Sequence, residues 1–131
     1  MDILQPPGWP RPAGYSDGVA ARGRQLFVAG QVGRAPGGAF ANDFVAQARQ
    51  AFANIVAVLA AGGGGPQHLV RLTWYVRDRA EYLANRDALG RAYREAFGKH
   101  FPAMTLVEVA ALVDDAARLE IEATAVVPDG E

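Results

Sequence analysis

The sequence predicts an α/β fold: a mixed β-sheet with two helices on one face, in the order β-β-α-β-α-β-β. Two patterns carry this prediction. In residues 42–61 and 79–97, apolar side chains recur at spacings of three and four, which is typical of amphipathic helices. Around these segments, shorter runs alternate apolar and polar side chains, which is typical of strands. A helix that connects strands of one sheet forms a right-handed crossover, so we expect both helices on the same face.

The first part of the chain predicts an extended arm followed by a hairpin. Residues 1–14 are rich in proline and glycine, which disfavours both a helix and a central strand. Residues 19–21 and 25–32 have strand character on either side of the turn signal Gly23-Arg24. We therefore expect these two runs to pair as an antiparallel hairpin.

The middle of the chain predicts a long amphipathic helix and then a central strand. Asn42 or Asp43 can accept hydrogen bonds from the free N–H groups at the helix start, and Gly62 can end the helix in the left-handed conformation. The glycine-rich connection after the helix is not followed by Gly-Lys-Ser/Thr, so it is not predicted to bind phosphate. In residues 70–76, strict alternation indicates a strand with one apolar face.

The last part of the chain predicts a second helix and two neighbouring strands. The helix covers about 79–97, and the β-rich runs 103–110 and 118–127 are joined by a hairpin or longer turn. In the final run, apolar side chains alternate with Glu and Thr, so the sheet face opposite the helices is partly apolar and partly charged. An uncovered face of this kind needs a partner, and we expect a closed homo-oligomer.

Composition excludes several classes of site. The 131 residues, half of them hydrophobic, are expected to form one domain over residues 1–131. Without cysteine, and with only His68 and His100, the chain cannot build an ordinary zinc site or a thiolate nucleophile, and each histidine is interpreted as a surface or capping residue. A net charge of −1 argues against a nucleic-acid partner. No apolar run has membrane length, so we expect a cytoplasmic protein that needs no metal or cofactor.

Six segments stand in a fixed order along the chain: residues 14–16, 26–32, 46–55, 71–78, 101–112 and 119–126, with the sequences GYS, LFVAGQV, AQARQAFANI, RLTWYVRD, FPAMTLVEVAAL and LEIEATAV. Together they resemble the YjgF/RidA family of reactive-intermediate deaminases, whose older label is endoribonuclease L-PSP. The resemblance covers nearly the whole chain. It implies a chorismate-mutase-like α/β fold, a homotrimer with three ligand clefts between subunits, and hydrolysis of enamines or imines to a carbonyl and ammonia without a cofactor.

One position departs from the family pattern. Deaminases of the family carry an arginine directly after a Pro-Ala pair, where it binds the substrate carboxylate, and this chain has Met104 there. A thioether cannot donate to a carboxylate, and losing a charge-assisted pair costs about 1.5–3 kcal/mol. The resemblance therefore implies a branch that lacks this arginine and disfavours 2-aminoacrylate as a substrate. Arg22, Arg71 and Arg77 are candidates to compensate.

The resemblance also points to individual site residues. Glu120 matches a cleft carboxylate that orients or activates water, and the alternative is a solvated strand glutamate. The candidate substrate-binding residues are Tyr15, Gly30, Gln31, Met104 and Thr105. For each of these a structural role is the alternative, such as an anchor for the arm or a β-bulge. If the last turn centres near Asp114, Glu108 faces Glu120 on the neighbouring strand, and repulsion between the two carboxylates favours one of them as a general base.

Two functional hypotheses follow. In the first, a homotrimer binds a small metabolite between subunits and hydrolyses an enamine or imine that is larger or less acidic than 2-aminoacrylate, with Glu120 positioning the water. In the second, the protein is a non-catalytic ligand-binding or chaperone-like module. Ribonuclease activity is disfavoured by the charge balance and by the lack of a positioned histidine pair.

Overall fold

Four strands form the main sheet, in the spatial order β3-β6-β4-β5. The strands are β3 (Arg24–Val32), β4 (Leu69–Val76), β5 (Ala103–Glu108) and β6 (Leu119–Val127). The computed structural model describes residues 1–130. In it, β6 runs antiparallel to both β3 and β4, whereas β4 and β5 are parallel. The sheet is therefore mixed, as predicted, and β4 is an internal strand.

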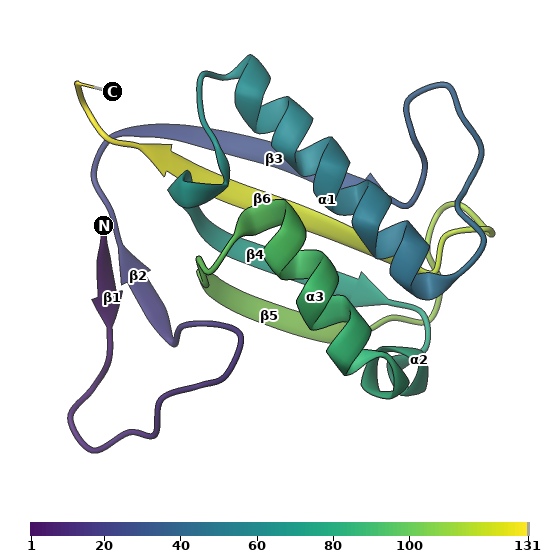
Figure 1. The fold of residues 1–131 in the computed structure, drawn as a ribbon, viewed down its shortest axis with the longest axis horizontal. Coiled ribbons are helices and arrows are strands. Elements are labelled where there is room, and N and C mark those ends of the chain that lie inside the picture. The colour runs from purple at the N-terminus through teal and green to yellow at the C-terminus, as the bar shows by residue number, and fades with distance from the viewer. Residues whose placement is uncertain (131) are drawn as a thin grey trace.

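The helices cover one face of this sheet. Helix α1 (Phe44–Ala61) and helix α3 (Arg86–Phe97) lie side by side across it, with the short α2 (Arg79–Ala84) at one end (Figure 1). The single helix predicted over 79–97 is in fact two, because the chain breaks at Asn85. The Asn85 N–H donates to the carbonyl of Tyr82, and its side-chain amide donates to that of Glu81, which ends α2 before α3 begins.

The ends of α1 were predicted in part. Asp43 is the N-cap, and its carboxylate accepts from the N–H of Ala46 at 2.8 Å. At the other end Gly62 has a φ of −93°, and it is Gly63, with a φ of 77°, that takes the left-handed conformation. The 3₁₀ turn η1 (Pro66–His68) then leads into β4.

The hairpin predicted over residues 19–32 is wrong. Strand β2 (Gly18–Ala20) pairs with β1 (Asp2–Leu4), which lies within the segment predicted as an extended arm, and not with β3. Gly23 does not form a hairpin turn. It allows the backbone to pass close to that of Val127, since a Cβ at position 23 would lie 2.1 Å from the carbonyl oxygen of Val127. The local pattern identified the strands, but pairing depends on which distant strands can bury the same face.

The predicted pairing of the last two strands also fails. Strand β4 lies between β5 and β6, so Glu108 does not face Glu120. Glu108 is instead opposite Val76, and its carboxylate accepts from the N–H of Arg79 at 2.9 Å. The long connection after β5 carries the chain past β4 to the far side.

The core lies between the sheet and the helices. At its centre Phe52 is fully buried, with its ring centroid 5.6 Å from that of Trp74, 5.9 Å from Tyr93 and 4.9 Å from Phe97. These tilted and edge-on contacts are the preferred arrangement of aromatic pairs. Helix α1 has the length and composition of a membrane span, but its apolar face packs in this core, so it is the core helix of the domain.

A buried amide fixes α1 to the segment that leads into β6. The Gln47 side chain donates to the carbonyls of Ala41 and Ala116, at 3.1 and 3.0 Å, and accepts from the N–H of Arg118 at 2.8 Å. Gly33 packs directly against this residue, because a Cβ at position 33 would lie 2.2 Å from the Cβ of Gln47. A buried amide that is fully hydrogen-bonded specifies one arrangement of the elements it joins.

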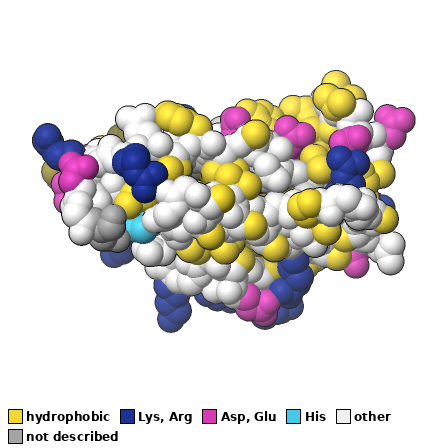
Figure 2. Space-filling view, turned by 90° about the horizontal axis from the view of Figure 1, so that it is seen from above, with side chains coloured by type: hydrophobic (Ala, Val, Ile, Leu, Met, Phe, Trp, Pro, Cys, Tyr) yellow, Lys and Arg dark blue, Asp and Glu magenta, His cyan; other side chains and the backbone are white. Residues whose placement is uncertain are grey.

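The other face of the sheet carries no helix. Along β6, apolar residues from Leu119 to Val127 are buried toward the helices, and alternate residues, including Glu120, Glu122 and Thr124, are only partly buried. On the neighbouring strand Phe27 is 72% exposed. On another side of the molecule, at 90° to the view of Figure 1, basic and acidic side chains are interspersed (Figure 2).

Candidate functional site

A cavity of about 460 Å³ opens beside Met104, between the β5 edge of the sheet and α3. The register explains why Met104 faces it. Met104 is opposite Leu72 on the parallel strand β4, and because Leu72 is buried under the helices, Met104 also points to the helix side. Thr105 follows directly and therefore points to the open face. The methionine thus forms part of the wall of this cavity, as an apolar residue.

Aromatic side chains make up much of the remaining wall. Tyr93 stacks on Phe101 with centroids 5.5 Å apart and an interplanar angle of 13°, and Trp74 meets Tyr82 edge-on at 5.9 Å. The Tyr93 hydroxyl donates to the carbonyl of His100 at 2.5 Å, and burial raises the pKa of Tyr93, so the hydroxyl keeps its proton and this hydrogen bond. The buried Trp74 Nε1 has no hydrogen-bond partner within residues 1–130.

The polar part of the cavity comes from α3. Arg86, Asp87 and Arg94 line it, together with Gly90. Arg86, Gly90 and Arg94 are spaced four residues apart, so they share one face of the helix. These residues were not among those predicted from the sequence. Their spacing is visible in the sequence, but only the packing of α3 against the sheet shows that this face borders Met104.

The predicted catalytic residue Glu120 lies on the opposite, open face of the sheet. It is paired with Val32 on β3 and with Tyr75 on β4. The Tyr75 hydroxyl donates to the Glu122 carboxylate at 2.7 Å. This hydrogen bond, then burial and the negative charges of Glu122 and Glu120, raise the pKa of Tyr75 above 10. The result is a small acidic cluster on the open face.

Gly30 lies directly beneath the Glu120 carboxylate. A Cβ at position 30 would be 2.2 Å from Glu120 Oε2, so the carboxylate occupies the space that any other residue would fill. The register of β3 shifts between Val28 and Gln31, which is a β-bulge around this glycine. Gln31 itself is opposite the buried Ile121, and its amide donates to the carbonyl of Ala29 at 3.1 Å.

The remaining candidates lie at the β5 edge. Tyr15 is 38% exposed and stands between Gly14, which lines the Met104 cavity, and Ser16, which bridges to Ala103. The Ser16 hydroxyl donates to the carbonyl of Phe101 at 2.5 Å, which holds this segment against the edge. One chain therefore brings Tyr15 and Met104 to the same edge, and Glu120 and Gly30 to the open face, without joining the two groups.

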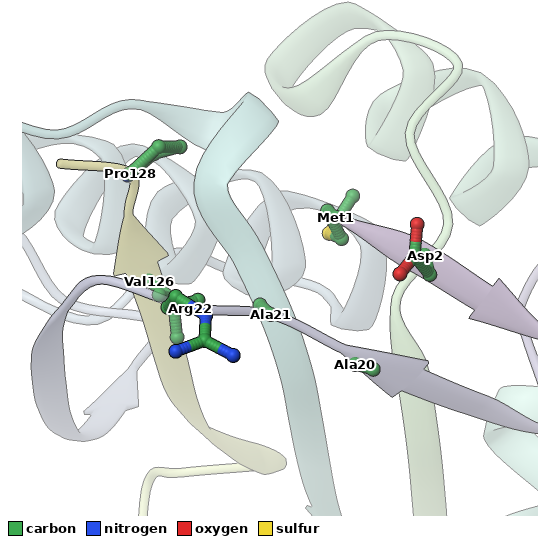
Figure 3. Close-up of a pocket in the computed structure, with 7 residues that line it drawn as sticks. All are labelled: Met1, Asp2, Ala20, Ala21, Arg22, Val126 and Pro128. Atoms are coloured by element: carbon green, nitrogen blue, oxygen red, sulfur yellow. The ribbon is translucent and has the colours of Figure 1, made fainter. Parts of the chain in front are cut away.

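None of the three arginines named as possible substitutes lines the Met104 cavity. Arg71 borders a hollow of about 360 Å³ on the open face, together with Phe27. Arg22 borders another, of about 370 Å³, between the β1–β2 ribbon and the end of β6 (Figure 3). Arg77 donates to the carbonyl of Asp115 at 2.5 Å and so holds the loop before β6.

The histidines have structural contacts. His68 is buried, and its Nδ1 accepts from the N–H of Gly65 at 3.0 Å, which is a capping contact on η1. A ring nitrogen of His100 lies 2.7 Å from the carbonyl oxygen of Leu69. Among the described residues no group of three or more His, Asp or Glu side chains is arranged to hold a metal ion.

Comparison with known proteins identifies the family. The model of endoribonuclease L-PSP matches residues 10–127. A RutC family protein of Pyrococcus horikoshii is 36% identical over 119 residues, which are 88% of this chain and 90% of that protein. A 2-iminobutanoate/2-iminopropanoate deaminase of Salmonella typhimurium is 37% identical over 113 residues, 86% of each chain.

The fold agrees with this assignment. The crystal structure of a protein of unknown function from the conserved Rid protein family, YyfB of Yersinia pestis, matches with a TM-score of 0.84 at 32% identity, covering 96% of this chain and 98% of that one. The chain therefore belongs to the YjgF/RidA family, the family of the endoribonuclease L-PSP model.

Proposed function

We propose that this protein is a cytoplasmic, single-domain homotrimer that binds a small metabolite in clefts between subunits and hydrolyses an imine or enamine there without a cofactor. The observation that carries the proposal is the separation of two half-sites. Glu120 stands on the open sheet face, and Met104 with Tyr15 stands at the β5 edge. A neighbouring subunit that packs its β5 edge against the open face would complete one cleft from the two halves.

The open face has properties that favour such packing. Phe27 is 72% exposed there and lines a hollow with Arg71 and Glu122. An exposed aromatic ring beside opposite charges is typical of a surface that another protein covers. A second copy of the same chain would cover it in a closed assembly, which is the commonest arrangement of soluble oligomers.

The chemistry needs little beyond a positioned water. Glu120 accepts a proton from water while the water oxygen bonds to the imine carbon, and the proton then passes to the nitrogen. The product of this addition is a carbinolamine. Glu120 then passes the hydroxyl proton to the amino group, and the carbon–nitrogen bond breaks as the carbonyl forms, which releases ammonia. An enamine first takes a proton at carbon to become the imine. The name of the Salmonella typhimurium relative, a 2-iminobutanoate/2-iminopropanoate deaminase, supports this reaction class.

The Met104 cavity favours substrates with an apolar side chain. Its wall includes Met104, Phe101 and Tyr93, which together offer an apolar surface. Each buried methylene group adds about 0.8 kcal/mol to binding. A substrate such as the imine of leucine or phenylalanine would gain more here than 2-aminoacrylate, which has no side chain to bury.

Imine hydrolysis tests the proposal directly. An amino-acid oxidase generates imines in situ from leucine, phenylalanine and glutamate, and ammonia release is measured with wild type, Glu120→Gln and Met104→Arg. We expect turnover of the apolar imines, a strongly lowered rate in Glu120→Gln, and a shift toward the acidic imine in Met104→Arg. A wild type that is inert on every imine, while Met104→Arg turns over the acidic one, would instead show a ligand-binding module.

The assembly is tested by sedimentation. The proposal requires a trimer, and a species with the 13.9 kDa mass of one chain would contradict it. Phe27→Glu, which places a charge on the open face, should shift the protein toward that mass. Val58→Glu is the matched control, because Val58 is 43% exposed on α1, on the helix side of the sheet.

A further inference from the structure

We propose that Arg94, assisted by Arg86, binds the carboxylate of the ligand in the Met104 cavity, and that the site thereby accepts an acid with a bulky apolar side chain. The substrate class rests on the proposed function, but anion binding does not require turnover. The chain would then replace the missing arginine of β5 with arginines from α3, on another wall of the same cavity.

The position of these arginines supports the proposal. Arg86 and Arg94 are two turns apart on one face of α3, and both line the cavity that Met104 lines. The space measures about 460 Å³, which lies within the range of small-molecule sites. Its wall is mostly aromatic and apolar, so a carboxylate in it needs a cationic partner.

Both guanidinium groups are uncommitted. In the described part of the chain, Arg49 forms an ion pair with Glu95, and Arg118 forms one with Glu81. Within residues 1–130, the side chains of Arg86 and Arg94 form neither an ion pair nor a hydrogen bond.

The local charge and the chemistry of arginine also favour the binding of a carboxylate in this cavity. Asp87 also lines the cavity, but it is bonded to neither arginine, and two positive charges outnumber its single negative one. A guanidinium fork can bind a carboxylate with two parallel hydrogen bonds, which makes arginine suited to this task.

Gly90 makes room for Arg94. A Cβ at position 90 would lie 3.3 Å from the Nη1 atom of Arg94, so the guanidinium rests against the bare helix surface at the cavity. A glycine inside a helix is unfavourable relative to alanine. A glycine at position 90 of α3 is explained if the guanidinium group of Arg94 needs the space above it.

Binding of a stable acid tests the proposal without catalysis. The probes are 3-phenylpropanoate and its uncharged amide, 3-phenylpropanamide, titrated calorimetrically into the assembled protein. We expect the acid to bind more tightly than the amide. Arg94→Gln should lower the affinity for the acid at least tenfold, and Arg86→Gln should lower it severalfold. Arg91→Gln is the matched control, since Arg91 is exposed on the same helix and does not line the cavity.

Three results would overturn the assignment: equal affinity for acid and amide, an equal effect of Arg94→Gln and Arg91→Gln, or no binding of the acid. Thermal unfolding of each variant checks that the fold is intact. A higher salt concentration should lower the binding affinity for the acid and leave the affinity for the amide unchanged, because only the acid is held by charge.

Kinetics separates this inference from the proposed reaction. With the imine of phenylalanine, Arg94→Gln should raise KM at least tenfold and change kcat little, whereas Glu120→Gln should lower kcat. If wild type hydrolyses no imine but Arg94→Gln still abolishes acid binding, the proposed hydrolysis fails and the role of Arg94 stands. If hydrolysis occurs and Arg94→Gln leaves KM unchanged, the role of Arg94 fails and hydrolysis stands.

Discussion

Replacement of Gly30 by alanine tests whether the position of the Glu120 carboxylate matters for activity. The new Cβ would lie 2.2 Å from Oε2, 2.8 Å from Cδ and 2.9 Å from Cγ of Glu120. Ordinary contacts begin near 3.4 Å, so the carboxylate oxygen has to move by about 1 Å. A displacement of this size in a reacting group lowers the rate by about a hundredfold.

Stability should change little in the same variant. The three atoms nearest to the new Cβ all belong to the partly buried Glu120 side chain, which can swing aside. Alanine also restricts the unfolded chain more than glycine does, which offsets part of any strain. We expect the free energy of unfolding to change by less than about 1 kcal/mol. Gly33→Ala is the contrasting variant: its Cβ would lie 2.5 Å from Gln47 Cα in the α1 backbone, so it should unfold the protein at much lower denaturant.

A double-mutant cycle identifies the route of the effect. Ammonia release from the imine of leucine is measured for Gly30→Ala, Glu120→Gln and the double variant. If Gly30→Ala acts by displacing Glu120, it should cause no further loss once that carboxylate has been removed. Full activity in a folded Gly30→Ala protein, or a further hundredfold loss in the Glu120→Gln background, would refute the reasoning.

Three other predictions concern stability and titration. Phe52→Ala removes the fully buried centre of the aromatic core and should lower the free energy of unfolding in urea by about 3–5 kcal/mol. Gly90→Ala should raise it by up to about 1 kcal/mol through helix propensity, while weakening 3-phenylpropanoate binding because the Arg94 head is displaced. Absorbance near 295 nm should show Tyr75 ionising above pH 10, and Glu122→Gln should return the pKa of Tyr75 toward 10. Because the folded state holds the Tyr75 proton more tightly, this stabilisation is complete below pH 10 and lost as the pH rises through the raised pKa.

The sequence predicted the elements better than their partners. Alternation identified β4 and β6, and the three-and-four spacing identified α1, because these patterns follow from which side of an element is buried. The same patterns do not say which strands are neighbours. Hence β2 was predicted to pair with β3, although it pairs with β1. Likewise β5 was predicted to pair with β6, although it pairs with β4. The break at Asn85 was missed because the apolar spacing continues through it.

Some residues of the candidate site could be predicted from the sequence, and others could not. Similarity to a family indicated Glu120, Gly30 and Met104, since these stand in recognisable segments. Arg86 and Arg94 lie in a segment without such a motif, and their relevance depends on how α3 packs beside β5. Charge alone directed attention to other arginines. Arg71 lies on the open face, Arg22 borders the hollow beside the β1–β2 ribbon, and Arg77 directly follows β4 and holds the loop before β6.

The central place of β6 has a consequence for how the chain folds. Strands β3 and β4 have no hydrogen bonds to each other, and both pair with β6, which is made last of the four. During synthesis, their apolar faces can be covered by α1 and α3, but their inner edges stay open until residues 119–127 emerge. Open strand edges template aggregation, and contacts between distant segments slow folding. A chain that stops before Leu119 should therefore aggregate instead of forming a smaller native domain, and refolding of the complete chain should depend on this one late insertion.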